Sequence, residues 1–329
     1  MQKHDYGSFA QALVDWFLLR GRDYPWRRTT DAWAILVSEI MLQQTTIPTV
    51  LGRYEAWLQQ FPTPAHLAAA DEQTALRSWE GLGYYRRVRA LRAAAITITE
   101  QHGGVFPTEE AAIRALPGIG DYTVAAVLSF AYNRPAALVD TNVSRVFARV
   151  FNDASPVDAP ATRKRHLALA AELVHSSNPR AYNSALMELG QTICTTGTPS
   201  CMLCPVREFC RAETPAELPV KLPKKDTLSA EHHDLWCLSE RGLLLEKQPG
   251  GKRHEGMYRL PQRPANEVQT LPLLGIQKYS VTRYKVTRYL HLAPANTVPQ
   301  GKEEFIPTDK LPEIPMASPD RKLITKHLH

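Results

Sequence analysis

The sequence lacks any long apolar run. Its 329 residues contain no window of roughly 18 or more consecutive apolar residues, which excludes an ordinary transmembrane helix. The first ten residues are polar and include Asp5, so they do not form the apolar core of a secretory signal peptide. We therefore expect a cytoplasmic protein with no membrane partner.

An excess of charge of one sign is also missing. Lys and Arg total 39 against 33 Asp and Glu, which gives a net charge of +6 and a pI near 9.0. This mild excess permits a polyanionic partner without proving one. With 44% hydrophobic and 22% charged residues, the composition excludes disorder over the whole chain, and the length suits two domains.

Cysteine is rare but clustered. Four of the five cysteines are Cys194, Cys201, Cys204 and Cys210, separated by six, two and five residues. In a cytoplasmic chain such a cluster favours a metal centre over disulfides. Tetrahedral zinc sites usually use two CxxC pairs and this chain has one, whereas iron–sulfur clusters accept irregular spacing. The spacing alone leaves both centres open. We expect Cys237 to be a buried apolar residue.

Helical patterns fill the first two thirds of the chain. Asp31 is a suitable N-cap for a strongly apolar helix that runs toward Thr45. Further apolar patterns at helical spacing, broken by short Gly and Pro punctuation, cover 64–80, 85–102, 108–115, 121–132, 141–151 and 162–175. These patterns predict an all-α domain over 1–212.

The character of the sequence changes after that domain. Residues 213–230 hold three Pro and three Lys and predict a linker. The segments 235–238, 243–247 and 281–292 are then typical of strands. We expect a smaller, β-rich second domain over 231–329.

Three features carry possible chemistry. Gly118 and Gly120 lie between two helical patterns, where they form either an ordinary turn or a backbone approach to an anion at a helix N-terminus. Asp140 precedes a periodic stretch, and by pattern alone it is an N-cap. Glu39 lies in the apolar helix. If buried, its raised pKa would suit a general acid, although helical periodicity alone favours the solvent face.

Together these features resemble the MutY family of adenine DNA glycosylases, in the helix-hairpin-helix superfamily that also contains endonuclease III. The resemblance covers almost the whole chain and is strongest over about residues 20–212. It rests on the four cysteines and on the segments Pro25–Arg27, Ser38–Thr45, Gly81–Tyr85, Leu116–Gly120, Val139–Val143 and Ala185–Gly190. It implies an all-α helix-hairpin-helix domain, with a 4Fe–4S cluster rather than zinc on the loop at 194–210, and then an α+β MutT-like (Nudix-like) domain.

The resemblance also implies the reaction. The family flips adenine out of an oxoguanine:A or G:A mispair and hydrolyses its N-glycosidic bond during base excision repair. Glu39 would protonate N7 of the base, and Asp140 would stabilise the positive charge that develops on the sugar or bond to its anomeric carbon. Tyr122 would support Asp140. It stands where the lyases of the superfamily carry a Schiff-base Lys, so a monofunctional enzyme is implied.

The same resemblance implies contacts with double-stranded DNA by a monomer. Gln44 and Tyr84 match residues that wedge into the duplex, while Thr45 and Leu82 match neighbours of the opposing base. Backbone N–H groups of the Gly118–Gly120 turn would bind a phosphate. Arg27 is a further predicted DNA contact. The sequence itself adds a cationic cluster after the wedge turn: Arg86, Arg87, Arg89 and Arg92. By themselves these residues would form a solvated helix face, but beside Tyr84 we expect them to follow the DNA backbone.

The chain departs from the family pattern at two places. Thr141 stands where the family usually has Gly. Val286-Thr287-Arg288 stands where typical members have a Phe-Ser/Thr-His stretch that probes oxoguanine, so only the hydroxyl of Thr287 is kept. These departures put the preference for oxoguanine over guanine in doubt. No Nudix signature is present, so nucleotide hydrolysis is not expected.

Three alternatives stay open from the sequence. One is a glycosylase of the same superfamily that acts on another mismatched or damaged base, for which Thr141 leaves room. The others are a catalytically silent DNA-binding iron–sulfur protein and a structural zinc module.

Overall fold

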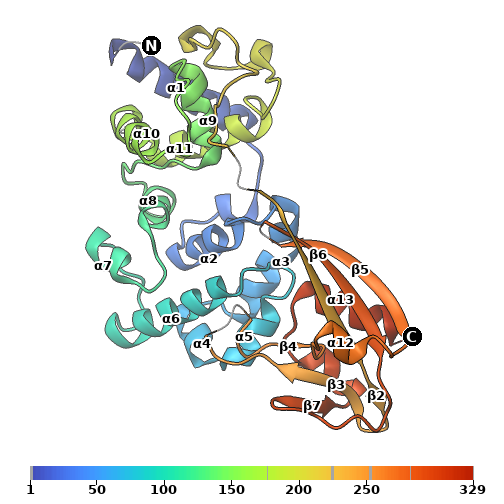
Figure 1. Ribbon diagram of the computed structural model, residues 1–329. Helices are drawn as coiled ribbons and strands as arrows, with labels where there is room; N and C mark the ends of the chain where they lie inside the picture. The colour runs from blue at the N-terminus through green and yellow to red at the C-terminus, as the bar shows by residue number, and fades with distance from the viewer. Residues whose placement is uncertain (1–2, 176, 224–225, 252–253, 282, 329) are drawn as a thin grey trace. The chain divides into compact units, whose positions relative to one another are not determined.

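The computed structural model describes residues 3–175, 177–223, 226–251, 254–281 and 283–328. The chain divides into two compact units (Figure 1). Unit 1 comprises residues 1–65 and 94–223, and unit 2 comprises residues 66–93 and 224–329. The sequence-based division differs most at 66–93, a helical segment that clusters with the C-terminal residues. Within the described ranges, no helix combines the length and apolar character needed to cross a membrane.

Unit 1 is helical, as the apolar patterns predict. Its helices are α1 (Tyr6–Arg20), α2 (Ala32–Leu42), α3 (Ile47–Gln60), the end of α6 (Arg86–Gln101), α7 (Glu110–Ala115), α8 (Asp121–Phe130), α9 (Thr141–Val150), α10 (Pro160–Leu173) and α11 (Pro179–Thr192). Short 3-10 turns occur at Lys3–Asp5, Pro25–Arg27, Cys201–Leu203 and Arg207–Phe209.

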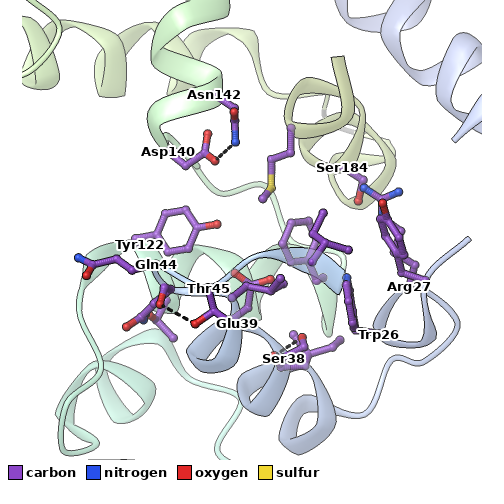
Figure 2. Close-up of a pocket in the computed structure, with 18 of the residues that line it drawn as sticks. Trp26, Arg27, Ser38, Glu39, Gln44, Thr45, Tyr122, Asp140, Asn142 and Ser184 are labelled. Carbon is purple, nitrogen blue, oxygen red and sulfur yellow. Dashed lines mark hydrogen bonds between the residues drawn. The ribbon is translucent and has the colours of Figure 1, made fainter. Parts of the chain in front are cut away.

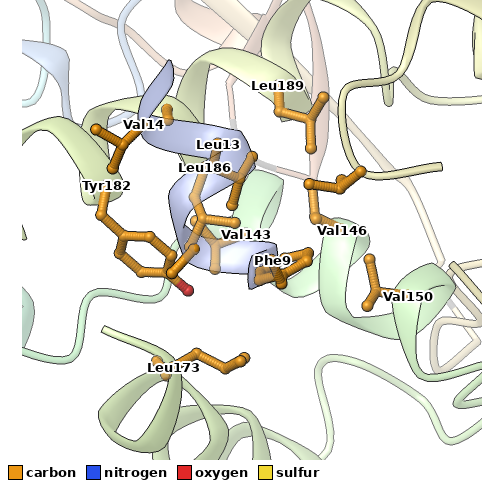
Figure 3. Packing of buried hydrophobic residues seen from close by; sticks show 14 of the residues in the cluster. Phe9, Leu13, Val14, Val143, Val146, Val150, Leu173, Tyr182, Leu186 and Leu189 are labelled. Atoms are coloured by element: carbon orange, nitrogen blue, oxygen red, sulfur yellow. The ribbon is translucent and has the colours of Figure 1, made fainter. Parts of the chain in front are cut away.

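One apolar core joins α1, α9 and α11 (Figure 3). Leu13 of α1, Val146 of α9 and Leu186 of α11 are fully buried in it. In α9 the apolar residues recur at three- and four-residue spacing, which places them on the face that packs against α1 and α11. This packing fixes the N-terminus of α9, where Asp140 lies.

Helix α2 is enclosed along almost its whole length. Every residue from Ala32 to Met41 is buried. Asp31 caps the helix, as predicted, because its carboxylate accepts hydrogen bonds from the backbone N–H groups of Trp33 and Ala34. A helix that is apolar on all sides belongs in a core. Glu39 therefore has no solvent face, and the expectation from periodicity was wrong.

Unit 2 is α+β, as expected. One sheet has the strand order β1 (Leu228–Trp236), β6 (Tyr284–Leu292), β5 (Leu273–Val281), with β1 parallel and β5 antiparallel to β6. In the other sheet, three strands pair antiparallel with β3 (Gly242–Lys247): β2 (Leu238–Ser239), β4 (Tyr258–Arg259) and β7 (Glu303–Ile306). Helices α12 (Ala265–Val268) and α13 (Ser318–His327) and a 3-10 turn at Thr308–Glu313 complete the C-terminal part.

The helical segment of unit 2 differs in detail from the predicted helix over 64–80. It forms two helices, α4 (Pro64–Ala69) and α5 (Glu72–Ser78). Asp71 separates them because its side chain caps α5 through the backbone N–H of Thr74. At the other end of the sequence, β1 begins at Leu228, inside the segment predicted as linker.

Candidate active site

A cavity of about 830 Å³ opens in unit 1 (Figure 2). Its walls come from α2, the loop after α2, the turn between α7 and α8, the start of α9, and α11. Glu39, Tyr122 and Asp140 all line it, although more than 100 residues separate the first from the last. Thr45, Gly118 and Gly120 line the same cavity.

Glu39 is 5% exposed. Burial raises the pKa of its carboxyl to about 7, and the negative charge of Asp140 acts in the same direction. A hydrogen bond with Tyr122 and the charge of Arg27 oppose the rise. The carboxyl thus holds a proton on a substantial fraction of molecules near neutral pH and can donate it into the cavity.

Tyr122 is the second residue of α8 and is half-buried. Its pKa lies well above the usual value for tyrosine because of burial, the negative charges of Glu39 and Asp140, and the hydrogen bond with Glu39. The phenol therefore stays neutral and can orient the carboxyl of Glu39.

Asp140 is the N-cap of α9 and a wall of the cavity at once. One carboxylate oxygen accepts a hydrogen bond from the backbone N–H of Val143 at 2.7 Å, and the other accepts one from the Asn142 amide at 2.8 Å. The capping interpretation was correct, and it also explains how the carboxylate is held in a fixed position. Thr141 follows it and is exposed.

Asn142 belongs to a longer hydrogen-bond chain that sequence reasoning missed. The Arg145 guanidinium donates to the Asn142 amide oxygen at 2.9 Å, to the Gly190 carbonyl at 2.6 Å and to the Cys194 carbonyl at 2.8 Å. A Cβ on Gly190 would approach the Cβ of Asn142 to 2.7 Å, so the close packing of α9 on α11 requires glycine there. This series of hydrogen bonds connects the Asp140 carboxylate to Cys194, the first cysteine of the loop.

Arg27 is held inside unit 1. Its guanidinium lies 2.9 Å from Glu188, which is 1% exposed and also pairs with Arg22. It further donates to the Arg22 carbonyl and lies over the rings of Phe17 and Tyr24. Arg27 lines the cavity, so its charge acts there on Glu39.

The turn between α7 and α8 has the features expected of an anion-binding hairpin. Gly118 adopts φ 73°, a left-handed conformation that favours glycine. Gly120 is the N-cap of α8, and a Cβ added to it would meet no atom within 4 Å. The backbone at the start of α8 can therefore be approached closely on the side of the Gly120 Cα.

Gln44 and Tyr84, the two residues matched to the wedge, share an uncommon backbone. Gln44 has φ 58° and Tyr84 has φ 46°, and both are exposed. A non-glycine residue held in this region is strained and often lies at a functional site. Leu82, in contrast, is 4% exposed, and Thr45 is half-buried.

The arginine cluster differs from its predicted arrangement. Arg87 is buried and donates to the carbonyls of Leu82 and Gly83. Arg89 pairs with Glu72 at 2.6 Å, and Arg92 donates to the Ala70 carbonyl at 2.8 Å. These three stabilise the segment that carries them and do not form a free cationic face. Arg86 is exposed.

The four clustered cysteines line one cavity of about 270 Å³. Burial, with a smaller contribution from the charges of the other three cysteines, raises the pKa of Cys204 to about 11. Within the described residues, no three His, Cys, Asp or Glu side chains lie close enough to hold one metal ion. Four thiols around one cavity are suitable ligands for a metal centre.

Thr287 lies in the middle of β6, half-buried. Its neighbour Arg288 points to the opposite face of the sheet and is 2% exposed. The Arg288 guanidinium lies 2.5 Å from Asp234 and 2.8 Å from Asp320. Arg288 therefore belongs to the core of unit 2, whereas Thr287 points away from that core.

Comparison with known proteins identifies relatives of the helical part of the chain. The family model of HhH-GPD superfamily base excision DNA repair proteins matches residues 37–170. The adenine DNA glycosylase of Mycolicibacterium smegmatis is 42% identical over 200 residues, 60% of this chain and 67% of that protein. Its Mycobacterium tuberculosis counterpart is 42% identical over 59% of this chain and 64% of that protein. The human adenine DNA glycosylase is 39% identical, over 64% of this chain and 40% of that protein. The match thus spans less than two thirds of the latter two.

Solved structures support the same fold for the helical part. A thermostable thymine-DNA glycosylase has a TM-score of 0.58 and 29% identity, and the match covers 63% of this chain and 95% of that one. An endonuclease III–DNA complex has a TM-score of 0.54 at 19% identity, over 64% of this chain and 96% of that one, a likeness of fold alone. The chain belongs to the HhH-GPD superfamily of base excision DNA repair proteins and, within it, to the MutY family of adenine DNA glycosylases.

Proposed function

We propose that this chain is a monofunctional adenine DNA glycosylase that removes adenine paired with oxoguanine or guanine. The observation that carries the proposal is the meeting of three residues in one cavity. Glu39, with a pKa of about 7, faces Tyr122 and the fixed carboxylate of Asp140. The named relatives support adenine as the base.

The cavity suits a flipped nucleotide, because a base must leave the duplex stack before its glycosidic bond can be attacked. The Glu39 carboxyl donates its proton to N7 of adenine. The C1′–N9 bond then breaks, its electron pair stays with the base, and adenine leaves as a neutral molecule. The sugar becomes an oxocarbenium ion, which the Asp140 carboxylate stabilises until water adds to C1′. The water gives its proton to the Glu39 carboxylate, which restores the acid.

Tyr122 fixes the Glu39 side chain and provides no amine. Without a lysine at this place the enzyme forms no Schiff base with the sugar, so we propose base removal without strand cleavage. Asn142 and Arg145 act as positioning residues, since Asn142 donates to the Asp140 carboxylate and Arg145 holds the amide of Asn142.

We propose a 4Fe–4S cluster on Cys194, Cys201, Cys204 and Cys210. When bound, it would tie the loop together through four thiolate bonds. Arg149 supports this assignment. Its buried guanidinium lies 3.2 Å from the Cys194 sulfur and donates to the carbonyls of Thr195 and Gly197. A hydrogen bond to a thiolate stabilises its negative charge. Iron and sulfide analysis of the purified protein tests the cluster.

For DNA we propose that Gln44 and Tyr84 enter the duplex and that the Gly118–Gly120 turn binds a phosphate. Thr45, Leu82, Arg27 and Arg86 match the remaining DNA-contact residues of the family. Of these, the exposed Arg86 suits a direct phosphate contact, and the buried Leu82 suits support of the turn that carries Tyr84.

We further propose that the C-terminal part of unit 2 is the MutT-like domain and recognises the base opposite adenine. Thr287 supports this because its side chain lies on the sheet face away from the core. Since the Phe and His of the usual stretch are missing, we expect only a modest preference for oxoguanine over guanine.

The test is single-turnover adenine release from oxoguanine:A, G:A and T:A duplexes, with wild type and Glu39→Gln. Fast release from the first duplex that the substitution abolishes supports the reaction and its acid. Equal rates on oxoguanine:A and G:A would support the reaction but contradict a preference for oxoguanine. Thymine release from a G:T pair, with no adenine release, would favour the second candidate, a thymine glycosylase, which the 29% identical structure and Thr141 suggest.

A further inference from the structure

The segment 66–93 is bound to the C-terminal residues of unit 2 by several direct contacts. The Tyr85 hydroxyl donates to the Met316 carbonyl at 2.9 Å in a buried position. Gln73 donates to the Gly256 carbonyl at 3.3 Å. Arg89 donates to the Glu255 carbonyl. The segment therefore has several fixed neighbours more than 150 residues away in the sequence.

The strongest of these contacts is an ion pair between Glu80 and Arg321. It has two parallel hydrogen bonds, at 2.8 and 3.0 Å, and both side chains are about one-fifth exposed. Arg321 also donates to the carbonyls of Leu311 and Ile314 at 2.5 and 2.6 Å. Because the guanidinium is already fixed by these carbonyls, it can orient Glu80 without losing much side-chain entropy.

Glu80 and Tyr85 flank the turn that carries Tyr84. Between them lie Gly81 and Gly83, with φ 94° and 69°, and Tyr84, with φ 46°. Successive left-handed residues are unfavourable for a tyrosine and persist only where the surroundings fix the backbone. Both ends of this turn are fixed by C-terminal residues, one through Arg321 and the other through Met316.

We infer that the C-terminal region positions Tyr84 for insertion into the duplex, with Glu80 and Arg321 as positioning residues. The inference rests on the proposed function, because it gives Tyr84 the wedge role. It assigns the C-terminal region a part in opening the duplex, separate from recognition of the opposing base.

The test compares Glu80→Gln with a matched control, Glu246→Gln. The control removes an ion pair of equal length, Arg259–Glu246 at 2.8 Å, with 26% and 23% exposed side chains. Both of its partners lie in the sheet around β3. Each protein is mixed in a stopped-flow instrument with an oxoguanine:A duplex that carries 2-aminopurine beside the adenine. The rise in fluorescence reports local unstacking, and adenine release is measured in parallel.

We expect Glu80→Gln to slow the fluorescence rise by about fivefold, because small displacements of a positioned group have large kinetic effects. Glu246→Gln should stay close to wild type. Tyr84→Ala should abolish the rise. Thermal melting of the two glutamine variants should be alike, which separates positioning from a general loss of stability.

The two failures can be told apart. A wild-type protein that neither unstacks the duplex nor releases adenine refutes the proposed function, and the inference with it. A wild type that does both, with Glu80→Gln indistinguishable from Glu246→Gln, refutes the inference alone. A full fluorescence rise in Tyr84→Ala also refutes it, since the turn would then not carry the wedge.

Discussion

Glu39 and Asp234 are two buried carboxyl groups whose pKa burial raises to about 7. Their surroundings differ. Glu39 lines an open cavity and meets the hydroxyl of Tyr122. Asp234, 0% exposed, lies 2.5 Å from the Arg288 guanidinium inside the core of unit 2, and Arg288 also pairs with Asp320.

The comparison teaches that a raised pKa by itself marks burial and not function. A perturbed carboxyl can act on a substrate only where a substrate can reach it. Glu39 meets that condition, whereas Asp234 compensates the charge of a buried arginine. The two residues should therefore respond to the same isosteric substitution in opposite ways.

The largest expected effect is on catalysis. Glu39→Gln should slow single-turnover adenine release by about 10³-fold, in the range typical of a lost general acid. Asp234→Asn, the matched control, should release adenine at nearly the wild-type rate. An equal loss in both variants would contradict the division of roles and point to a common effect on folding.

The next largest effect is on stability, where Asp234→Asn should lose more than Glu39→Gln. Asp234→Asn should lower the free energy of unfolding by about 3 kcal/mol, because it leaves a buried cation with one partner fewer. Glu39→Gln should leave it unchanged or raise it slightly at pH 8, where the wild-type carboxylate is charged and buried and the charge of Arg27 compensates it only in part. Urea unfolding followed by circular dichroism measures both. A larger loss of unfolding free energy in Glu39→Gln than in Asp234→Asn would contradict the division of roles.

The third effect is the pH dependence. The rate of adenine release, measured with enzyme below saturation, should fall about tenfold per pH unit above pH 7 as Glu39 loses its proton. The fall should be the same in wild type and Asp234→Asn. The same pKa gives the pH dependence of stability. Glu39 has a folded pKa above its unfolded value, so its contribution to the free energy of unfolding is complete below about pH 4 and is lost as pH rises through 7. Glu39→Gln should flatten that decline, and a decline of unchanged slope would contradict the assignment.

The sequence predicts local features well and three-dimensional surroundings poorly. The cap at Asp31 and strand β3 depend on neighbouring residues, so pattern alone identifies them. The burial of Glu39 depends on the elements that enclose α2. Arg288 follows the same rule. Its burial depends on Asp234 and Asp320, which are distant from it in the sequence.

The smallest effect sharpens the comparison at Glu39 itself. The hydrogen bond from Tyr122 holds the pKa of Glu39 below the value that burial alone would give. Tyr122→Phe should therefore move the high-pH limb of adenine release upward, by less than about one pH unit. Tyr54→Phe is the matched control, because its hydroxyl donates to the Ala34 carbonyl, also on α2, at 3.1 Å. If both variants move the limb equally, the shift comes from α2 as a whole and the direct bond has no special role. If only Tyr122→Phe moves it, the phenol lowers the pKa of the proposed acid through a neutral hydrogen bond, whereas at Asp234 the charge of Arg288 lowers the pKa.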